Sequence, residues 1–415
     1  MLDARLARVA TGLVRRTARR LRGRPVNPVS FAGMTLDADD VERAKQWLAA
    51  PRETWADPAP RRAFETAFAE MNDSRAAFAF TSARESLSAV IEALGLEPGD
   101  EVVMPGYTCV VVPNAFRFAG VTVRYADIEL DTYGPSLESV RERTTERTRA
   151  LLIHHLYGLV CRDYEALVAF AREQGIPVIE DCAQATGARF EGRGVGNLGD
   201  VAVFSCEQTK GFTTINGGLA VTDRFDIADR LSVVQNAAPE PDVAWTEHIL
   251  NHLLLRYHVA KRPHGSLAAD WTQARYSQYQ LAPMTPEETR GVRPEAYGRR
   301  MPAPLAAIGL GQLAKLDAYN QRRREAAAGW DRWARERGYE VPHVLENSVP
   351  SFLRYPLLVD PARKDDLTWA RRELGFQPGV WFVSNLHPVT DRRPAESVPS
   401  ADRAVACCIN LPTLR

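Results

Sequence analysis

The sequence lacks any apolar run long enough to cross a lipid bilayer. A membrane-spanning helix needs about 20 consecutive apolar residues, whereas the apolar run at residues 249–255 is far shorter. The N-terminus also lacks the long apolar core of a secretory signal. These absences favour a cytoplasmic protein, with attachment to a membrane surface as the alternative.

A surplus of one charge and a metal-binding cysteine pattern are missing as well. The 52 lysines and arginines equal the 52 aspartates and glutamates in number, so the balance does not indicate a nucleic-acid-binding protein. The six cysteines form no CxxC pair and have no histidine at metal-ligand spacing, so we expect a reducing compartment and no metal site. What the chain does have is 415 residues, 45% of them hydrophobic, which is enough for a sizeable core.

Polar residues follow two short apolar segments. Residues 176–180 are predicted to form a buried strand that leads into Asp181, and residues 201–204 a second strand that leads into Ser205. Because ligands bind at the carboxyl ends of strands in open α/β sheets, Asp181 and Ser205 are expected to face a ligand, with Lys210 on the loop beyond. A partly desolvated lysine can form a Schiff base, and a carboxylate can keep a pyridinium nitrogen protonated. Each residue alone has a simpler interpretation, a helix cap for Asp181 and a solvated loop residue for Lys210.

Together with their neighbours, these residues resemble the DegT/StrS family of pyridoxal phosphate-dependent, fold type I sugar aminotransferases. The matching segments around them are residues 180–184, 199–201, 204–205, 209–210 and 217–218, and the resemblance covers most of the chain from about Leu36 onward. It implies an α/β fold with a large domain, whose mostly parallel central sheet is sandwiched by helices, and a smaller C-terminal α+β domain.

The resemblance also implies a role for each matching residue. Lys210 would hold pyridoxal 5′-phosphate as an aldimine and later act as the general base, and Asp181 would meet the pyridine nitrogen. Gln184 would lie near the ring oxygen, Ser205 would bind the phosphate, and Tyr107 would stack on the ring. The alternative for Tyr107 is a turn residue that packs into the core.

The predicted phosphate loop departs from the family pattern. Ser82, Ala83 and Arg84 stand where the family has Ser-Gly-Thr, at the start of a helix predicted over residues 85–95. Backbone N–H groups and the helix dipole at such a position favour a phosphate, so these three residues are assigned to the cofactor. Arg84 either adds an ionic contact to the phosphate or lies exposed in the first helical turn.

A second departure concerns the homodimer that the resemblance implies. In the family an asparagine reaches the phosphate of the neighbouring subunit, whereas this chain has Tyr297, Gly298 and Arg299 at that point. The substitution leaves this cross-subunit contact open, with replacement by Arg299 and a solvated Arg299 as the two alternatives.

Four parts are expected along the chain. They are a basic arm at residues 1–29, a large cofactor-binding domain at 30–235, an atypical insertion that shapes the acceptor site at 236–298, and a small domain at 299–415. Strands alternate with amphipathic helices through the large domain, which is the pattern of a parallel sheet covered by helices. In the small domain, residues 305–337 are predicted to form one long helix.

The basic arm combines leucines near helical period with many arginines. This pattern is typical of a helix that lies in a membrane interface. We therefore expect either peripheral membrane contact through residues 1–24 and 245–264, or an arm that is solvated or packed on the partner subunit.

The function that the resemblance implies is a ping-pong transamination. L-glutamate is the expected amino donor; it would convert the cofactor to pyridoxamine 5′-phosphate, which would aminate a keto-sugar. The expected acceptor is nucleotide-linked, with a keto-cyclitol or a lipid-linked sugar as alternatives, and its candidate contacts are Trp381, Asn385 and His387. The competing hypothesis is a membrane-peripheral scaffold subunit of glycan or secondary-metabolite assembly that has kept the fold without turnover. Retention of Lys210 and Asp181 favours the enzyme.

Overall fold

The computed structural model describes residues 35–260, 284–376 and 378–414. The predicted basic arm, and with it the membrane contact expected for residues 1–24, lies outside the described residues, as do residues 261–283 of the insertion. Among the described residues, no helix is both long and apolar enough to span a membrane.

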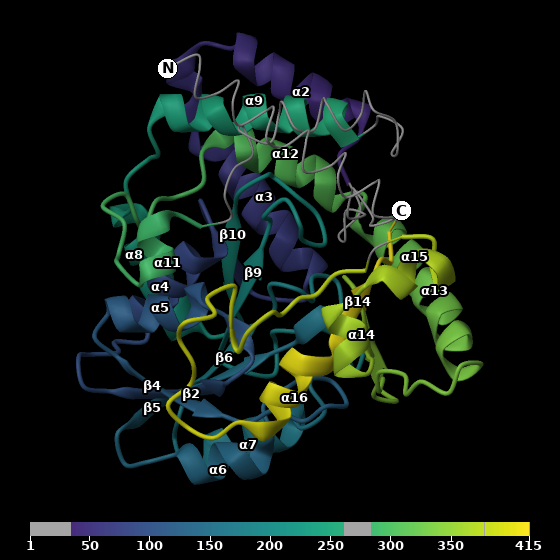
Figure 1. Cartoon of the computed structure of the whole chain (residues 1–415). Coiled ribbons are helices and arrows are strands. Elements are labelled where there is room, and N and C mark those ends of the chain that lie inside the picture. The colour runs from purple at the N-terminus through teal and green to yellow at the C-terminus, as the bar shows by residue number, and fades with distance from the viewer. Residues whose placement is uncertain (1–34, 261–283, 377, 415) are drawn as a thin grey trace, which may run out of the picture.

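A seven-stranded sheet forms the centre of the molecule (Figure 1). In spatial order its strands are β1 (Ala76–Phe80), β10 (Gly218–Thr222), β9 (Val201–Ser205), β6 (Val178–Asp181), β5 (Thr148–His154), β2 (Glu101–Pro105) and β4 (Thr122–Ala126). β10 is antiparallel to both of its neighbours, and every pairing from β9 to β4 is parallel. The mostly parallel sheet expected from the sequence is thereby confirmed.

Helices cover both faces of this sheet, as buried parallel strands require. Successive residues of a strand point to opposite faces. In β5, accordingly, Leu152 belongs to the hydrophobic core on one face, and Leu151 and Ile153 belong to the core on the other. The first core includes α4 (Ala83–Ala93), α5 (Val111–Phe118) and α8 (Phe225–Ala237); the second includes α3 (Pro58–Met71), α7 (Tyr164–Glu173) and α12 (Ala303–Leu313).

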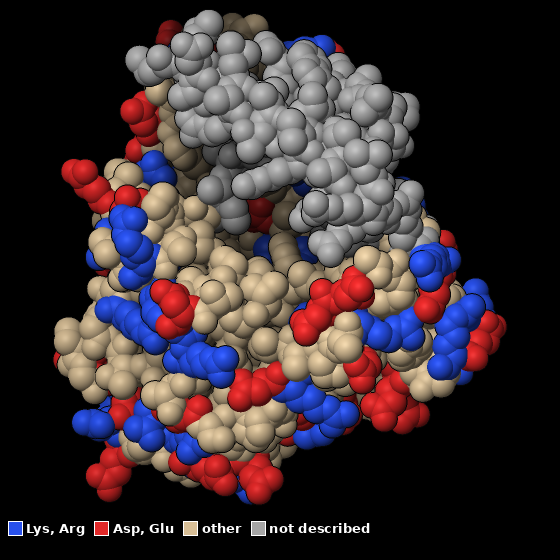
Figure 2. Space-filling model, viewed as in Figure 1, with Lys and Arg blue, Asp and Glu red and all other residues tan. Residues whose placement is uncertain are grey.

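The charged side chains on the surface are mixed in sign. Figure 2 shows lysine and arginine interspersed with aspartate and glutamate over the described part of one face. Many of them form exposed ion pairs, such as Arg162 with Asp131 at 2.9 Å. Exposed pairs of this kind contribute little to stability, typically below about 1 kcal/mol each.

The apolar run of the insertion is part of the core. It lies in α9 (Val243–Ala260), which packs along α2 (Ala38–Ala49) and α12. The side chains of Ile249, Leu250 and Leu253 are at most 1% exposed. Contact of this run with a membrane, one of the two sequence-based expectations, is therefore wrong for these three side chains, because protein already covers them.

The single long helix predicted over residues 305–337 is also wrong in detail. The segment forms α12 and α13 (Leu316–Arg335), with Ala314 and Lys315 between them. α12 is apolar all round and buried against α3, whereas α13 buries one face only. At the junction, the Lys315 ammonium lies 2.7 Å from the Asp40 carboxylate of α2, so the two helices meet beside α2.

The C-terminal part of the chain forms a smaller unit against one side of the sheet. In it, β12 (Tyr355–Leu358) pairs with β14 (Cys408–Leu411), flanked by α14 (Pro361–Asp365) and α16 (Pro399–Cys407). A short strand of this unit, β13 (Leu386–His387), pairs in parallel with β3 (Thr108–Cys109). This pairing ties the two units together beside the carboxyl ends of the central strands.

Candidate active site

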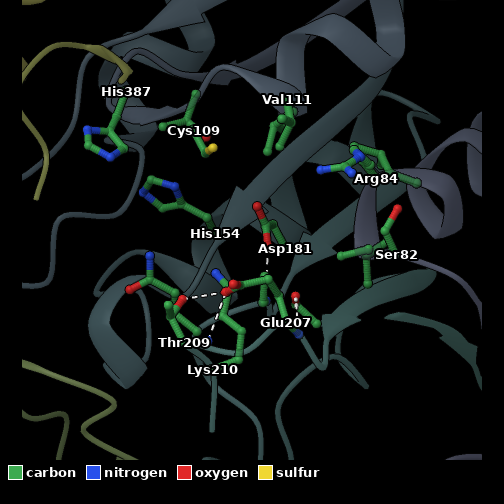
Figure 3. Close-up of a pocket in the computed structure, with 18 of the residues that line it drawn as sticks. Ser82, Arg84, Cys109, Val111, His154, Asp181, Glu207, Thr209, Lys210 and His387 are labelled. Atoms are coloured by element: carbon green, nitrogen blue, oxygen red, sulfur yellow. Dashed lines mark hydrogen bonds between the residues drawn. The ribbon is translucent and has the colours of Figure 1, made fainter. Parts of the chain in front are cut away.

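A cavity of about 370 Å³ lies at the carboxyl ends of β5, β6 and β9. Its base comes from these strands, and its walls come from the start of α4, from β3, and from the segment around β13 (Figure 3). Parallel α/β sheets bind ligands at this edge. The residues that the sequence assigns to the cofactor and that line the cavity are Ser82, Ala83, Arg84, Asp181, Gln184, Ser205 and Lys210.

Lys210 lies in the loop after β9, where its backbone N–H donates to the Glu207 carbonyl at 2.9 Å. Burial lowers the pKa of its ammonium group below the ordinary 10.5, although the negative charges of Glu207 and Asp181 oppose the shift. A lysine in this setting releases its proton more readily than a solvated one, which is what a nucleophilic amine requires.

Asp181 occupies the last position of β6 and is oriented by the backbone. The N–H of Ala183 donates to its Oδ1 at 3.0 Å. The preceding residue, Glu180, points to the opposite face of the sheet, where its carboxylate accepts from Tyr164 Oη at 2.6 Å and from His155 Nε2 at 2.9 Å. This buried network holds the strand end in place and leaves Asp181 to face the cavity.

His154 and His155 both line the cavity, and His155 is in addition bonded to Glu180 through Nε2. His154 Nε2 lies 2.6 Å from the Tyr133 carbonyl oxygen. Because a carbonyl only accepts, Nε2 carries the proton and Nδ1 keeps its lone pair. Burial lowers the pKa of this imidazole to about 4 despite the opposing charge of Asp181, so His154 is neutral near pH 7.

The start of α4 forms the end of the cavity that lies opposite His154 and His387 (Figure 3). Ser82 is the N-cap, and its Oγ accepts from the Glu85 N–H at 3.3 Å. The N–H groups of the first helical turn have no acceptor within the helix, which suits an anion at this end of the cavity. β10 passes very close by: a Cβ on Gly218 would lie 2.3 Å from the Ala83 nitrogen.

Arg84 lines the cavity and does not lie exposed, so the second of its two alternatives is wrong and its contact with a phosphate stays a prediction. Its Nε lies 2.6 Å from Glu288 Oε1 of α11 (Pro286–Arg290), and its side chain is 17% exposed. It is therefore an ion-paired residue of the cavity wall and not a solvated first-turn residue. The pair links the start of α4 to α11, which belongs to the insertion at residues 236–298.

Arg299 is ion-paired as well and belongs to a smaller neighbouring cavity of about 170 Å³. Its Nη2 lies 3.7 Å from Glu85 Oε1, and its guanidinium lies over the Trp245 ring at 4.9 Å. The solvated alternative for Arg299 is therefore wrong. Tyr297 closes this neighbouring cavity and donates to the Arg84 carbonyl at 3.3 Å.

Tyr107 requires a correction. It is completely buried, its hydroxyl is 2.9 Å from that of Tyr157, and its ring packs against Tyr133 and Phe382. It thus forms part of an aromatic cluster behind the cavity wall, which fits the core interpretation and not the stacking role. β3 turns the next residues, including Cys109, toward the cavity instead.

Of the three acceptor candidates, Trp381 and His387 line the cavity and Asn385 does not. Asn385 is 4% exposed; its side chain donates to Asp402 at 3.0 Å and its carbonyl accepts from the Thr108 N–H at 2.8 Å. Its role is to join the small unit to β3, so its assignment to the acceptor is corrected.

Two charged residues of the cavity, Arg256 and Glu207, were not assigned from the sequence. Arg256 of α9 reaches the cavity and donates from Nη2 to the Gln208 carbonyl at 3.1 Å. Glu207 accepts from the Thr209 N–H at 2.9 Å through Oε2, while its Oε1 is buried without a hydrogen-bond partner among the described residues. The charge of Arg256 directly after the apolar run at residues 249–255 was the available signal, but only packing shows which way its side chain points.

The polar groups of the cavity match the functional groups of pyridoxal 5′-phosphate. Hydroxyls of Ser82 and Ser205, together with the first turn of α4, suit a phosphate at one end. Lys210 supplies an amine for the aldehyde, and Asp181 a carboxylate for a pyridine nitrogen. Each matches one functional group of that cofactor.

Comparison with known proteins identifies the family to which the chain belongs. Residues 36–415 match the model of the DegT/DnrJ/EryC1/StrS aminotransferase family. A GDP-perosamine synthase of Escherichia coli O157:H7 is 36% identical over 167 residues, 40% of this chain and 46% of that protein. The L-glutamine:scyllo-inosose aminotransferase of Streptomyces griseus is 38% identical over 169 residues, 41% of this chain and 40% of that protein. The chain thus spans about half the length of the curated relatives it matches.

Solved structures share the fold. The aminotransferase TlmJ of Streptoalloteichus hindustanus has a TM-score of 0.70 at 24% identity, covering 93% of each chain. NtdA of Bacillus subtilis, solved with bound pyridoxamine phosphate, has a TM-score of 0.70 at 21% identity, covering 91% of this chain and 78% of that one. These likenesses establish the α/β architecture of fold type I.

Proposed function

Because the chain belongs to the DegT/DnrJ/EryC1/StrS aminotransferase family, we propose that it transfers an amino group from L-glutamate to a keto-sugar, using pyridoxal 5′-phosphate. The observation that carries the proposal is the presence of Lys210, Asp181 and the first turn of α4 in one cavity. A scaffold without turnover would not need a desolvated lysine and a backbone-oriented carboxylate in the same space.

The cofactor of this family is pyridoxal 5′-phosphate, which supplies an aldehyde that takes up amino groups and a ring that withdraws electrons. The residues Ser82 and Ser205 would hold its phosphate together with the N–H groups of α4. A fixed phosphate keeps the reacting atoms in register with Lys210 during proton transfer.

Lys210 has the chemical role. Its Nζ would bind the cofactor covalently and, once displaced by the donor, would carry a proton from the substrate carbon to the cofactor. The lowered pKa of its ammonium group favours the neutral amine that accepts this proton. Glu207, which lies in the same loop and lines the cavity, provides a nearby negative charge that favours the protonated form after the transfer.

At the base of the cavity, Asp181 provides a negative charge and His154 is a neutral neighbour. The Asp181 carboxylate would keep the pyridine nitrogen protonated, which is the state in which the ring withdraws electrons best. His154 is neutral, so it adds no positive charge that would compete for this carboxylate. Its ring lines the cavity beside Asp181 (Figure 3).

The acceptor side of the cavity is formed by Trp381 and His387. An aromatic ring with polar neighbours is suited to a sugar, which presents C–H groups as well as hydroxyls. The relatives named above are a GDP-perosamine synthase and an L-glutamine:scyllo-inosose aminotransferase; for this chain we propose a nucleotide-linked keto-sugar. A homodimer is proposed on the same family basis.

The proposal is tested by the visible absorbance spectrum of the purified protein, with and without L-glutamate. Wild-type protein should show a cofactor band that L-glutamate bleaches and that a keto-acid restores. Lys210→Ala should bind the cofactor without this cycle. Protein that shows no cofactor band after reconstitution with pyridoxal 5′-phosphate would refute the proposal.

A further inference from the structure

Glu288 is a buried carboxylate of the insertion that three neighbours hold in place. It belongs to α11, which packs on α5, and it is 1% exposed. Its Oε2 accepts from the Thr285 N–H at 2.8 Å, its carbonyl accepts from Asn114 Nδ2 of α5 at 2.7 Å, and its Oε1 lies 2.6 Å from Arg84 Nε. Buried charged groups are normally paired and hydrogen-bonded in this way. The position of the Glu288 carboxylate is therefore fixed by the packing of α11.

This carboxylate sets the direction of the Arg84 guanidinium. A guanidinium is planar, so a hydrogen bond to its Nε fixes the plane in which Nη1 and Nη2 lie. Arg84 lines the cavity of Lys210 as well as the smaller neighbouring cavity. In Figure 3 its side chain extends from the start of α4 toward the middle of the cavity, next to Ser82. A residue of the insertion thus holds Arg84 at the phosphate end of the cavity.

The charge of Arg84 acts on the same space as the charge of Lys210. Burial raises the pKa of the Cys109 thiol, which lines the cavity, and the positive charges of Lys210 and Arg84 oppose the shift. Arg299, a second arginine near the first turn of α4, lines the neighbouring cavity instead, and its Nη2 lies 3.7 Å from Glu85. Of these two described arginines, Arg84 is the one placed to meet an anion in the cavity.

We propose that Glu288 is a positioning residue, which holds Arg84 so that its guanidinium binds the phosphate of pyridoxal 5′-phosphate. The inference rests on the proposed function, because it requires this cofactor in the cavity. A long arginine side chain loses conformational entropy when it binds a ligand, and a second anchor reduces that loss. Glu288 would therefore contribute to cofactor binding without contacting the cofactor.

The experiment compares pyridoxal 5′-phosphate with pyridoxal, which has the same ring and aldehyde but no phosphate. Absorbance titration of the full-length protein, freed of cofactor, gives both dissociation constants. For pyridoxal 5′-phosphate we expect a rise of about 10-fold in Glu288→Met and about 10- to 100-fold in Arg84→Met, as for loss of a charge-assisted hydrogen bond. The dissociation constant of pyridoxal should stay near the wild-type value in both variants. A purely structural role would weaken both ligands alike.

The variant that combines Arg84→Met with Glu288→Met shows whether Glu288 acts through Arg84. If it does, the combined variant should bind pyridoxal 5′-phosphate as Arg84→Met does, because residues of one network are not additive. Glu287→Met is the matched control. Glu287 is the preceding residue of α11, and its side chain is 47% exposed and pairs with Arg290 at 3.4 Å. This variant should bind both ligands as the wild type does.

Three results would overturn the proposal: unchanged binding of pyridoxal 5′-phosphate by Glu288→Met, equal weakening of both ligands, or a full further effect of Glu288→Met when Arg84→Met is present. If Glu288→Met folds poorly, Arg84→Met decides, because a loss confined to the phosphate-bearing ligand supports the proposal and no loss overturns it. The proposed function fails separately, when L-glutamate does not bleach the wild-type cofactor band. The two dissociation constants do not depend on that step, and calorimetry with inorganic phosphate tests the anion site without any cofactor.

Discussion

At the scale of single residues, neighbouring side chains at the end of β6 have different roles. Asp181 faces the cavity while Glu180, one position earlier, is locked into a buried network on the other face of the sheet. The last two residues of β6 therefore comprise one structural side chain, Glu180, and one side chain that faces the cavity, Asp181.

Replacing Asp181 by asparagine tests the proposed role of its carboxylate at the pyridine nitrogen. A neutral amide cannot hold the pyridine nitrogen protonated, so the rate of bleaching by L-glutamate should fall roughly 100-fold or more, within the range for loss of a positioned acid or base. Cofactor binding should persist, because the phosphate contacts are untouched. A rate within threefold of wild type would contradict the role of Asp181.

Ionisation of Glu85 should make the free energy of unfolding depend on pH. Burial raises its pKa to about 7 against the opposing charges of Arg299 and Arg84, from an ordinary value of 4.5. Between these values the folded protein holds a proton that the unfolded chain has released. The free energy of unfolding therefore falls as the pH rises through this window, by up to about 1.4 kcal/mol per pH unit.

Glu85→Gln isolates this effect, because glutamine resembles the protonated acid at every pH. Relative to wild type, the variant should be more stable at pH 8 than at pH 5, with a difference on the order of 3 kcal/mol between the two conditions. Urea unfolding at both pH values measures it. An equal offset at both would show that Glu85 ionises normally.

At the scale of elements, the phosphate end depends on how closely β10 approaches the first turn of α4. Gly218 lies where any side chain would meet backbone atoms of Ser82 and Ala83. The anion site is thus a product of strand and helix packing together. A helix N-terminus alone would not fix it.

Gly218→Ala should push α4 away from β10. We expect a loss of stability of about 1–3 kcal/mol, typical of overpacking, accompanied by weaker retention of the cofactor on dialysis. Gly329→Ala is the matched control, since in α13 the nearest atom to its Cβ would be 4.0 Å away. It should stabilise by about 0.5–1 kcal/mol. Equal effects of the two substitutions would show that the close approach is unimportant.

At the scale of the whole molecule, the cavity lies between two units of the chain. The large unit supplies Lys210, Asp181 and α4, and the small unit supplies Trp381 and His387. A ligand that fills this space contacts both units, so it should stabilise the molecule as a whole.

Pyridoxal 5′-phosphate should accordingly raise the melting temperature in a concentration-dependent way. At 100 times its dissociation constant, a ligand of the folded state adds about 2.7 kcal/mol. Lys210→Ala should show a smaller rise at the same concentration, because it lacks the covalent contact. Scanning calorimetry of both proteins measures the difference, and equal shifts would argue that Lys210 does not bind the cofactor.

The sequence predicted the parts of this arrangement that depend on local pattern. Asp181 and Ser205 follow apolar strands directly, so their place at the sheet edge could be inferred from strand direction. Tyr107 and Asn385 could not be placed in this way, since the direction of their side chains is decided by packing between β3 and β13. Arg256 was missed because it comes from α9, which lies far along the chain from the motif residues.

The backbone bonds between β3 and β13 have a consequence for how such a protein can change. The Thr108 and Val110 N–H groups hold the carbonyls of Asn385 and His387 at 2.8 Å each, independently of most side chains in this segment. Replacing Trp381 or His387 would then alter the lining of the cavity without displacing its wall. Substitutions at these two positions can therefore change substrate preference during evolution, while the residues around Lys210 keep their positions.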